Sequence, residues 1–349
     1  MQRLHKLRQE MKLKGISNLL VSSLSDIYYL TGFTGSAAYL FVTPENAIFI
    51  TDGRYTEQSR IQVGPDFQVD IVKDYRQAVK ELCEGLSGMH VTYACSLADY
   101  EMLMEMPGNV LIDSDRLIST LRMEKEEPEL EKIRQMFVCA KISFEASLDS
   151  FQIGRSELLW ASELERYMKI NGAKSPSFDT IIASGARGAL PHGIASEKLV
   201  EPNDSVVVDF GAKKEYCSDV TRLVMTGEDS DVTLIADIVY TALAKAKDKV
   251  KAGVKCSEIH NVARDYIIEK GYGDFFNHGL GHGLGIDVHE KPVFNPKDNT
   301  VLKENMVLTI EPGIYLPGKF GVRLEDTVVV KNDGCENLTA VFDKYVYKI

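Results

Sequence analysis

The sequence predicts two domains, an α/β domain over residues 1–121 and a larger domain of helices and strands over residues 131–349. The chain has 349 residues, more than the roughly 150 of an ordinary single domain. Strand-like and helix-like segments alternate in the first part, which is typical of α/β folds. A dense charge run that contains Pro128, RMEKEEPELEK, follows that part, and we place a linker at residues 122–130.

Composition and charge are those of an ordinary globular protein. Hydrophobic residues make up 44% and charged residues 26% of the chain. The 40 Lys and Arg against 51 Asp and Glu give a net charge of −11, which argues against binding to nucleic acid. No apolar run approaches the ~18 residues that span a bilayer. The six cysteines are scattered, which is typical of a reducing compartment. We therefore expect a soluble, cytoplasmic protein that binds no membrane.

The first domain is predicted as a series of short elements. Leu4, Leu7 and Met11 recur at helical spacing. Four segments rich in Val, Ile, Tyr and Phe are predicted as strands: NLLVSS, DIYYLTGF, AAYLFVTP and NAIFITDG. A helix, a strand, a helix, a strand and a helix are then predicted at RYTEQSRIQV, FQVDIV, YRQAVKELCEGLSG, HVTYAC and LADYEMLMEM. This alternation is the basis of the α/β assignment.

The second domain begins with helices and ends with strands. Long helical patterns occur at EKIRQMFVCAKISFEASLDSF and SELLWASELERYMKINGA, and strands are predicted from Phe178 onward. Two further helices are predicted at TLIADIVYTALAKAKDKVKAG and SEIHNVARDYIIEKGY. From Val288 to the end the pattern indicates strands and turns.

Histidines concentrate in one segment of the second domain, HGLGHGLGIDVHEKP. Three of the seven histidines in the chain lie in it, namely His278, His282 and His289. Alternating glycines make a helix unfavourable by roughly 1 kcal/mol each, so we expect an irregular loop or strand. The segment lacks the H-E-x-x-H pattern of zinc proteases, because Val293 stands where the second histidine would be. The clustering still indicates a functional site.

Acidic residues are placed in pairs by two predicted hairpins. In VVVDFGAKKEYCSDVTRLV, a three-residue loop at 213–215 would set Asp209 directly opposite Asp219. Their Cβ atoms would then lie about 5 Å apart. In MVLTIEPGIYLPGKFGVRLEDTVVV, reflection about Gly318 sets Glu311 opposite Glu325. Like charges placed in this way destabilise a sheet unless a cation lies between them.

Four carboxylates and one histidine form the ligand set of a dinuclear divalent-metal site. Their summed charge would balance two M²⁺ ions, and oxygen-rich ligation favours Mn²⁺, Co²⁺ or Zn²⁺ over metals that prefer thiolates. Two such ions about 3.5–4 Å apart can hold a water molecule and lower its pKa. The pattern therefore indicates hydrolysis.

The chain resembles the M24 metallopeptidases, in the branch of Xaa-Pro aminopeptidases and Xaa-Pro dipeptidases (prolidases). The similar stretches are SFDTIIASGARGALPHG, VVVDFG, CSDVTR, HGLGHGLGIDVHEKP, TIEPGIY and GVRLEDTVVV. DIYYLTGFTGS and ITDGRY resemble the N-terminal domain of the same branch. The resemblance implies an α/β creatinase-like N-terminal domain, an α+β pita-bread (creatinase/aminopeptidase) catalytic domain, and a homodimer.

The resemblance also implies a role for each candidate residue. The ligands of two ions, most simply Mn²⁺ with Co²⁺ or Zn²⁺ as alternatives, would be Asp209, Asp219, His282, Glu311 and Glu325. Asp219 and Glu325 would bridge the ions, and Glu311 would also take the proton of the attacking water. His289 and His192 would lie near the scissile carbonyl, and His278 would line the proline side. Arg323 would orient a metal-binding carboxylate.

The implied substrates are proline-containing peptides cleaved at an N-terminal Xaa-Pro bond. Two features depart from the family pattern: the two aspartates are one residue closer together than usual, and Val293 occupies a position where dipeptidases often carry an arginine for the substrate carboxylate. The second departure favours an Xaa-Pro aminopeptidase, with an Xaa-Pro dipeptidase as the alternative. A catalytically silent fold used as a binding module is the alternative of another class, and the five intact ligands argue against it.

Overall fold

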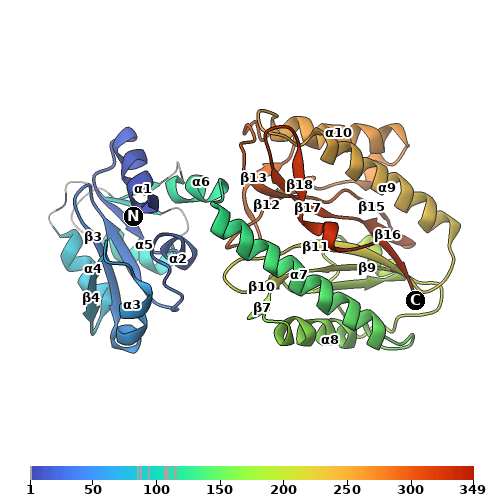
Figure 1. Ribbon diagram of the computed structural model, residues 1–349, viewed down its shortest axis with the longest axis horizontal. Coiled ribbons are helices and arrows are strands. Elements are labelled where there is room, and N and C mark those ends of the chain that lie inside the picture. Colours follow the sequence, from blue (N-terminus) through green and yellow to red (C-terminus); the bar gives the residue numbers. More distant parts are fainter. Residues whose placement is uncertain (1, 85, 87–88, 93–94, 106–109, 114–115) are drawn as a thin grey trace. The chain divides into compact units, whose positions relative to one another are not determined.

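The computed structural model describes residues 2–84, 86, 89–92, 95–105, 110–113 and 116–349. The chain divides into two units, Met1–Arg122 and Met123–Ile349 (Figure 1). Within the described residues, no helix has both the length and the apolar character needed to cross a membrane.

The first unit is built on a mixed sheet with strand order β4-β3-β2-β1-β5-β6. Its strands are β1 (Leu19–Val21), β2 (Tyr39–Val42), β3 (Ala47–Asp52), β4 (Gln68–Val72), β5 (Met89–Thr92) and β6 (Val110–Asp113). Its helices are α1 (Gln2–Leu13), α2 (Leu24–Thr31), α3 (Thr56–Gln62), α4 (Tyr75–Cys83), α5 (Leu97–Met104) and α6 (Leu117–Met123), with a 3₁₀ turn η1 (Gly53–Tyr55). Leu4, Leu7 and Met11 are buried on one face of α1, as predicted.

One predicted strand of this unit is wrong, because DIYYLTGF lies mainly in helix α2. Ser23 caps the helix, and its hydroxyl accepts a hydrogen bond from the backbone N–H of Asp26. At the other end Gly32 adopts φ 80°, and its N–H donates to the carbonyl of Tyr28. These two caps satisfy backbone groups at both ends of a short helix, and they outweigh the strand preference of its aromatic residues.

The second unit has four long helices, as predicted: α7 (Glu127–Ser150), α8 (Glu157–Ile170), α9 (Ser230–Lys249) and α10 (Cys256–Glu269). A four-stranded sheet in the order β19-β11-β9-β8 contains β8 (Ile181–Ser184), β9 (Ser205–Phe210), β11 (Val220–Met225) and β19 (Val346–Lys348). A five-stranded sheet in the order β13-β12-β14-β17-β18 contains β12 (Gly281–Gly283), β13 (Glu290–Phe294), β14 (Val307–Ile310), β17 (Asp326–Val330) and β18 (Cys335–Asn337).

Two short ribbons and three 3₁₀ turns complete this unit. The ribbons pair β7 (Ser175–Pro176) with β10 (Ala212–Lys213), and β15 (Gly313–Leu316) with β16 (Phe320–Arg323). The turns are η2 (Gly185–Ala189), η3 (Gly273–Phe275) and η4 (Leu338–Val341). Figure 1 shows the pair α9 and α10 and the pair α7 and α8 on opposite sides of the strands. Apolar residues of α9 and α10 form one buried cluster with residues of β14, β16 and β17.

The second predicted hairpin has the expected register. Gly313 pairs with Arg323 in the β15–β16 ribbon, and Ile310 pairs with Asp326 between β14 and β17. Both pairs fit the predicted reflection about Gly318, which also relates Glu311 to Glu325.

The first predicted hairpin differs from expectation by two residues, because Asp209 pairs with Thr221 and not with Asp219. A bridge between Lys213 and Cys217 closes the loop, so the loop is residues 214–216. Tyr216 is buried, and its hydroxyl donates to Glu129 at 2.7 Å. This contact with α7 holds Tyr216 in the loop rather than opposite Ala212.

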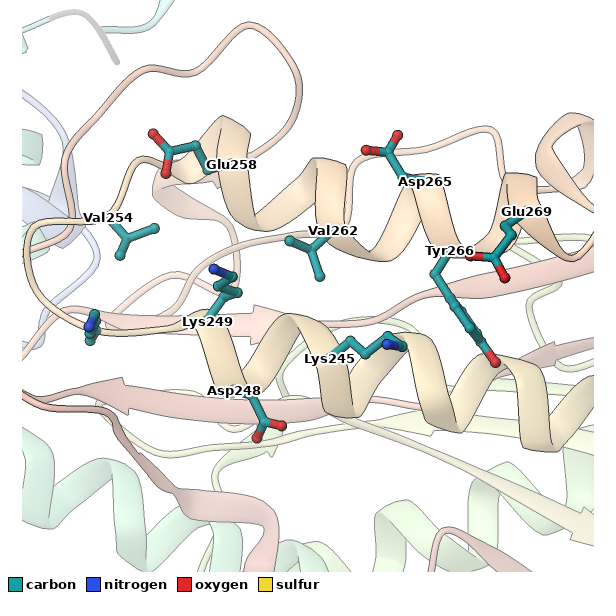
Figure 2. Close-up of a pocket in the computed structure, with 10 residues that line it drawn as sticks. Lys245, Asp248, Lys249, Val254, Glu258, Val262, Asp265, Tyr266 and Glu269 are labelled. Atoms are coloured by element: carbon teal, nitrogen blue, oxygen red, sulfur yellow. The ribbon is translucent and has the colours of Figure 1, made fainter.

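A groove of about 740 Å³ runs between α9 and α10 (Figure 2). Its charged lining includes lysines from α9 and acids from α10: Lys245, Lys249, Glu258, Asp265 and Glu269. Both signs of charge therefore line the groove, so it favours neither a cationic nor an anionic ligand.

Candidate metal centre

Three of the predicted metal ligands meet at one buried point of the second unit. Asp209, Asp219 and Glu325 each place one carboxylate oxygen within 4.8 Å of the others. Asp209 lies near the end of β9 and Asp219 directly precedes β11, its neighbour in the sheet. The backbone N–H of Glu325 donates to the carbonyl of Thr221 at 3.3 Å, which brings the segment between β16 and β17 onto the same sheet.

The other two predicted ligands lie beside this cluster. His282 Nε2 is 3.6 Å from Asp219 Oδ2 and 3.4 Å from Glu311 Oε1. The other ring nitrogen, Nδ1, lies 3.1 Å from the carbonyl oxygen of Gly283, so the ring presents Nε2 to the carboxylates. The structure thus brings together all five residues that the sequence predicts as ligands.

Glycines allow the strand that carries His282 to approach its neighbours. A Cβ on Gly281 would lie 2.0 Å from the carbonyl oxygen of Thr309, and one on Gly283 would lie 2.3 Å from that of Lys291. Both separations are far inside van der Waals contact, so only glycine fits at these two positions. The histidine-glycine segment is therefore the close-packed strand and loop that its composition predicts.

Burial and mutual repulsion shift the titration of the acids. Burial raises the pKa of Asp219 and of Glu325 well above the usual range, and the neighbouring carboxylates raise it further. Burial also raises the pKa of Glu311, to about 7. The pKa of His282 is lowered by burial. Without a cation, burial and repulsion therefore favour the protonated forms of Asp219 and Glu325, as expected for clustered carboxylates in a desolvated site.

The hydrogen bonds of the cluster leave free oxygens for a cation. Asp209 Oδ2 accepts from Arg323 Nη2 at 2.5 Å, and Glu325 Oε2 accepts from Thr221 Oγ1 at 2.9 Å. The second oxygens, Asp209 Oδ1 and Glu325 Oε1, are buried with no hydrogen-bond partner in the described part of the chain. Buried polar atoms without partners are rare and call for an explanation. Carboxylates with one imidazole fit a divalent ion such as Mn²⁺, Co²⁺ or Zn²⁺.

Arg323 holds one of these carboxylates, and each nitrogen of its guanidinium donates a hydrogen bond. Besides Asp209, Nε donates to Thr221 Oγ1 at 3.2 Å. Nη1 donates to the carbonyl of Pro191 at 3.0 Å and to the hydroxyl of Tyr315 at 2.9 Å. Arg323 thus orients a carboxylate of the cluster, that of Asp209.

A cavity of about 540 Å³ opens onto the cluster. The three histidines predicted to contact substrate, His192, His278 and His289, all line it. The ring centroids of His289 and His282 are 4.4 Å apart. Burial, together with the positive charge of Arg323, lowers the pKa of His278 to about 4, so this ring is neutral at physiological pH. Among the described residues that line the cavity, Arg323 is the only arginine or lysine.

Three residues of the site were missed in the sequence. The hydroxyl of Tyr315 lies 3.0 Å from His278 Nε2 and also accepts from Arg323. Thr221 supports Glu325, and Thr309 Oγ1 donates to Glu311 Oε1 at 3.3 Å. The two threonines stand two residues from Asp219 and Glu311, where strand alternation places side chains on the same face. That alternation was a usable signal for them.

Comparisons with known proteins agree with this geometry. Residues 131–332 match metallopeptidase family M24, and residues 3–124 match the creatinase/prolidase N-terminal domain. The Xaa-Pro dipeptidase of Pyrococcus horikoshii is 36% identical over 349 residues, which cover 97% of each chain.

Solved structures extend the similarity to the whole fold. A Xaa-Pro dipeptidase from Bacillus anthracis has a TM-score of 0.95 at 35% identity, covering 100% of this chain and 99% of that one. The X-Pro aminopeptidase from Thermotoga maritima has a TM-score of 0.89 at 37% identity, covering 99% of both. The predicted fold, a creatinase-like domain followed by a pita-bread catalytic domain, is confirmed. The chain belongs to metallopeptidase family M24, in its branch of Xaa-Pro peptidases.

Proposed function

We propose that this protein hydrolyses the N-terminal Xaa-Pro bond of peptides with a dinuclear metal centre. The observation that carries the proposal is the meeting of four carboxylates and one imidazole beside the 540 Å³ cavity, which all of them except Glu325 line. The residues that would hold two divalent ions are Asp209, Asp219, His282, Glu311 and Glu325. When bound, such ions lower the pKa of a water and offset negative charge on the scissile carbonyl oxygen.

The side chains of the cavity supply the remaining steps. Glu311 would accept a proton from the attacking water, and Thr309 holds one of its oxygens. His289 and His192 line the cavity and would donate hydrogen bonds to the tetrahedral intermediate. His278, held by Tyr315, would form the side of the cavity that receives the proline ring.

For substrate length we propose an Xaa-Pro dipeptidase. The relative from P. horikoshii and the B. anthracis structure are both named Xaa-Pro dipeptidases. The aminopeptidase expected from Val293 is therefore less well supported than its dipeptidase alternative.

The aminopeptidase remains the second candidate because of the charges in the cavity. A dipeptide carries its carboxylate beside the proline, where desolvation without a cation is unfavourable. Every nitrogen of Arg323 already has a partner, and Val293 carries no charge. A longer peptide carries its carboxylate further out, where water can solvate it. The similarity to the T. maritima X-Pro aminopeptidase also supports this candidate.

A substrate panel with metal-reconstituted protein separates the candidates. We expect Xaa-Pro dipeptides to have a kcat/KM at least about tenfold above that of Xaa-Pro-Yaa peptides, a difference of about 1.4 kcal/mol in transition-state stabilisation. The reverse ratio would assign an aminopeptidase, and Val293→Arg should then improve the dipeptides. Xaa-Ala peptides are the control for proline. No hydrolysis of any peptide with any of the three metals would support the silent binding module instead.

Manganese as the metal in the cell, a cytoplasmic location and a homodimer stay predictions. Metal analysis of protein isolated without added metal tests the first, and cell fractionation tests the second. Light scattering of the purified chain tests the third, with a mass of about twice 38.9 kDa expected.

A further inference from the structure

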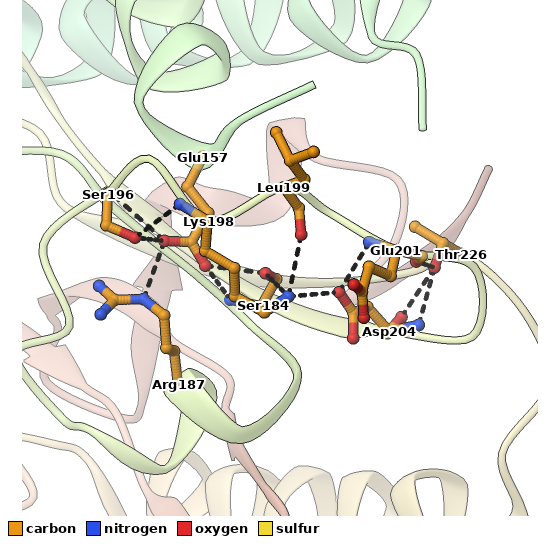
Figure 3. Close-up of polar contacts among 9 residues, drawn as sticks. All are labelled: Glu157, Ser184, Arg187, Ser196, Lys198, Leu199, Glu201, Asp204 and Thr226. Carbon is orange, nitrogen blue, oxygen red and sulfur yellow. Dashed lines mark hydrogen bonds and ion pairs between the residues drawn. The ribbon is translucent and has the colours of Figure 1, made fainter. Parts of the chain in front are cut away.

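A buried acid of the second unit, Glu157, lies outside the predicted motifs and does not line the cavity. Glu157 is the first residue of α8, and its side chain is 0% exposed. Its Oε1 accepts from the backbone N–H and the hydroxyl of Ser184, both at 2.8 Å. Its Oε2 accepts from Arg187 Nε at 2.9 Å, and from the hydroxyl and N–H of Ser196 at 2.7 and 3.1 Å. Figure 3 shows these groups converging on the carboxylate.

The residues bound by Glu157 flank, in the sequence, a segment that lines the cavity. Pro191, His192 and Ile194 line the cavity, and all three lie between Arg187 and Ser196 in the chain. Arg187 extends the network, because its Nη2 donates to the carbonyl of Ile194 at 2.6 Å. The N–H of Ile194 in turn donates to the carbonyl of His192 at 2.9 Å. The path from Glu157 to His192 is therefore continuous.

Further bonds fix the two ends of this segment. Lys198 Nζ donates to Ser184 Oγ at 2.8 Å and to Asp204 Oδ2 at 2.9 Å (Figure 3). The N–H of Glu157 donates to the carbonyl of Lys198 at 2.9 Å. On the opposite side the carbonyl of Pro191 accepts from Arg323. The segment 184–198, which we call the His192 loop, is thus held between α8 and the strand that carries Arg323.

We propose that Glu157 is a positioning residue for Xaa-Pro hydrolysis, which holds His192 in place against the substrate through Ser184, Arg187 and Ser196. The inference rests on the proposed function, because it assigns His192 a contact with the substrate. A carboxylate is required at this position. Both oxygens face backbone N–H donors that cannot be reversed, so a glutamine in either orientation would set its NH₂ group against a donor.

Glu157→Gln is the direct test, in the full-length, metal-reconstituted enzyme. We expect kcat/KM for an Xaa-Pro substrate to fall by about 10- to 100-fold with unchanged metal content, as for a misplacement of catalytic groups by about 1 Å. In the His192→Ala background the same change should cost less than about threefold, because residues that act through one another are not additive. Ser196→Ala, which removes one of the five bonds, should show a smaller loss with the same dependence on His192.

The control is Glu163→Gln, in the same helix, whose carboxylate pairs with Arg166 at 3.3 Å. It should leave kcat/KM and the His192 loop unchanged. Equal losses for Glu157→Gln with and without His192, loss of metal, or an unaffected His192→Ala enzyme would each overturn the inference.

Hydrogen exchange separates this inference from the proposed function, because it needs no substrate. Backbone amides of the His192 loop should exchange at least about tenfold faster in Glu157→Gln than in the wild type and the control. Unchanged exchange would overturn the positioning role even in an active enzyme. A wild type inactive on Xaa-Pro peptides would overturn the proposed function, and the exchange result would still decide whether Glu157 holds the loop.

Discussion

Replacement of Gly321 by alanine should disturb both the stability and the catalysis of the second unit. A Cβ on Gly321 would lie 1.9 Å from the carbonyl oxygen of Gly188 and 2.6 Å from its carbon, whereas contacts below 3.0 Å essentially do not occur. Strand β16 and turn η2 must therefore separate by at least 1.1 Å. Both groups are backbone, so neither can rotate away.

The magnitude follows from the size of this forced opening. Overpacking of this kind is unfavourable by about 1–3 kcal/mol. For a unit of this size each kcal/mol lowers Tm by about 2–4 °C, so a decrease of about 2–12 °C is expected. The opening also separates Arg323, at the end of β16, from the carbonyl of Pro191. A displacement of about 1 Å should lower kcat/KM by about 10- to 100-fold.

Calorimetry of the unfolding transition and kcat/KM with a fixed Xaa-Pro substrate measure the two effects. Gly334→Ala is the matched control, because a Cβ there meets no atom within 4 Å. If Gly321→Ala matched this control in both Tm and kcat/KM, the close contact between η2 and β16 would be needed neither for stability nor for the position of Arg323.

Three further predictions concern the metal centre and its histidines. Removal of metal should abolish activity but leave the far-UV circular dichroism and a cooperative thermal transition intact. Addition of Mn²⁺ or Co²⁺ should restore turnover. Full activity in protein shown to be metal-free would contradict the dinuclear centre. His282→Ala should lose metal by elemental analysis and reduce turnover by orders of magnitude, whereas His289→Ala should keep both ions and lower only the rate; if His289→Ala lost them, that residue would be a ligand. In the folded chain the pKa of His278 is about 4, whereas in the unfolded chain it is about 6.5. Between these pH values the unfolded chain binds a proton on this ring and the folded chain does not. The stability that the neutral, buried ring of His278 contributes is therefore lost as pH falls from about 6.5 to about 4. In denaturant titrations, His278→Asn should be less sensitive to pH over that range than the wild type.

The part of the site that the sequence could predict is the part set by local pattern. Glu311 and Glu325 lie either side of a Pro-Gly turn, and reflection about that turn is enough to place them together. The aspartate hairpin was placed two residues out of register, because a buried contact from Tyr216 to Glu129, 87 residues away, sets its loop. The residues around Tyr216 in the sequence do not indicate such a distant partner.

The reasons differ for α2 and for Glu157. In α2 the aromatic residues suggested a strand, although Ser23 and Gly32 stand at cap positions that the sequence does show. Glu157 opens a helix with no motif around it, and its five donors come from Ser184, Arg187 and Ser196, which are 27 to 39 residues away. Its importance becomes visible only when the chain is folded.

The guanidinium of Arg323 joins a proposed metal ligand to the His192 loop. It binds Asp209, a proposed metal ligand, and also the carbonyl of Pro191, which precedes His192. By thermodynamic reciprocity, whatever a bound peptide adds to the affinity of the centre for its ions, the ions must add equally to the affinity for the peptide. If a bound peptide strengthens this link, the affinity of the centre for its ions rises with peptide bound, and at scarce metal the peptide-bound protein would hold its ions more tightly than the free protein.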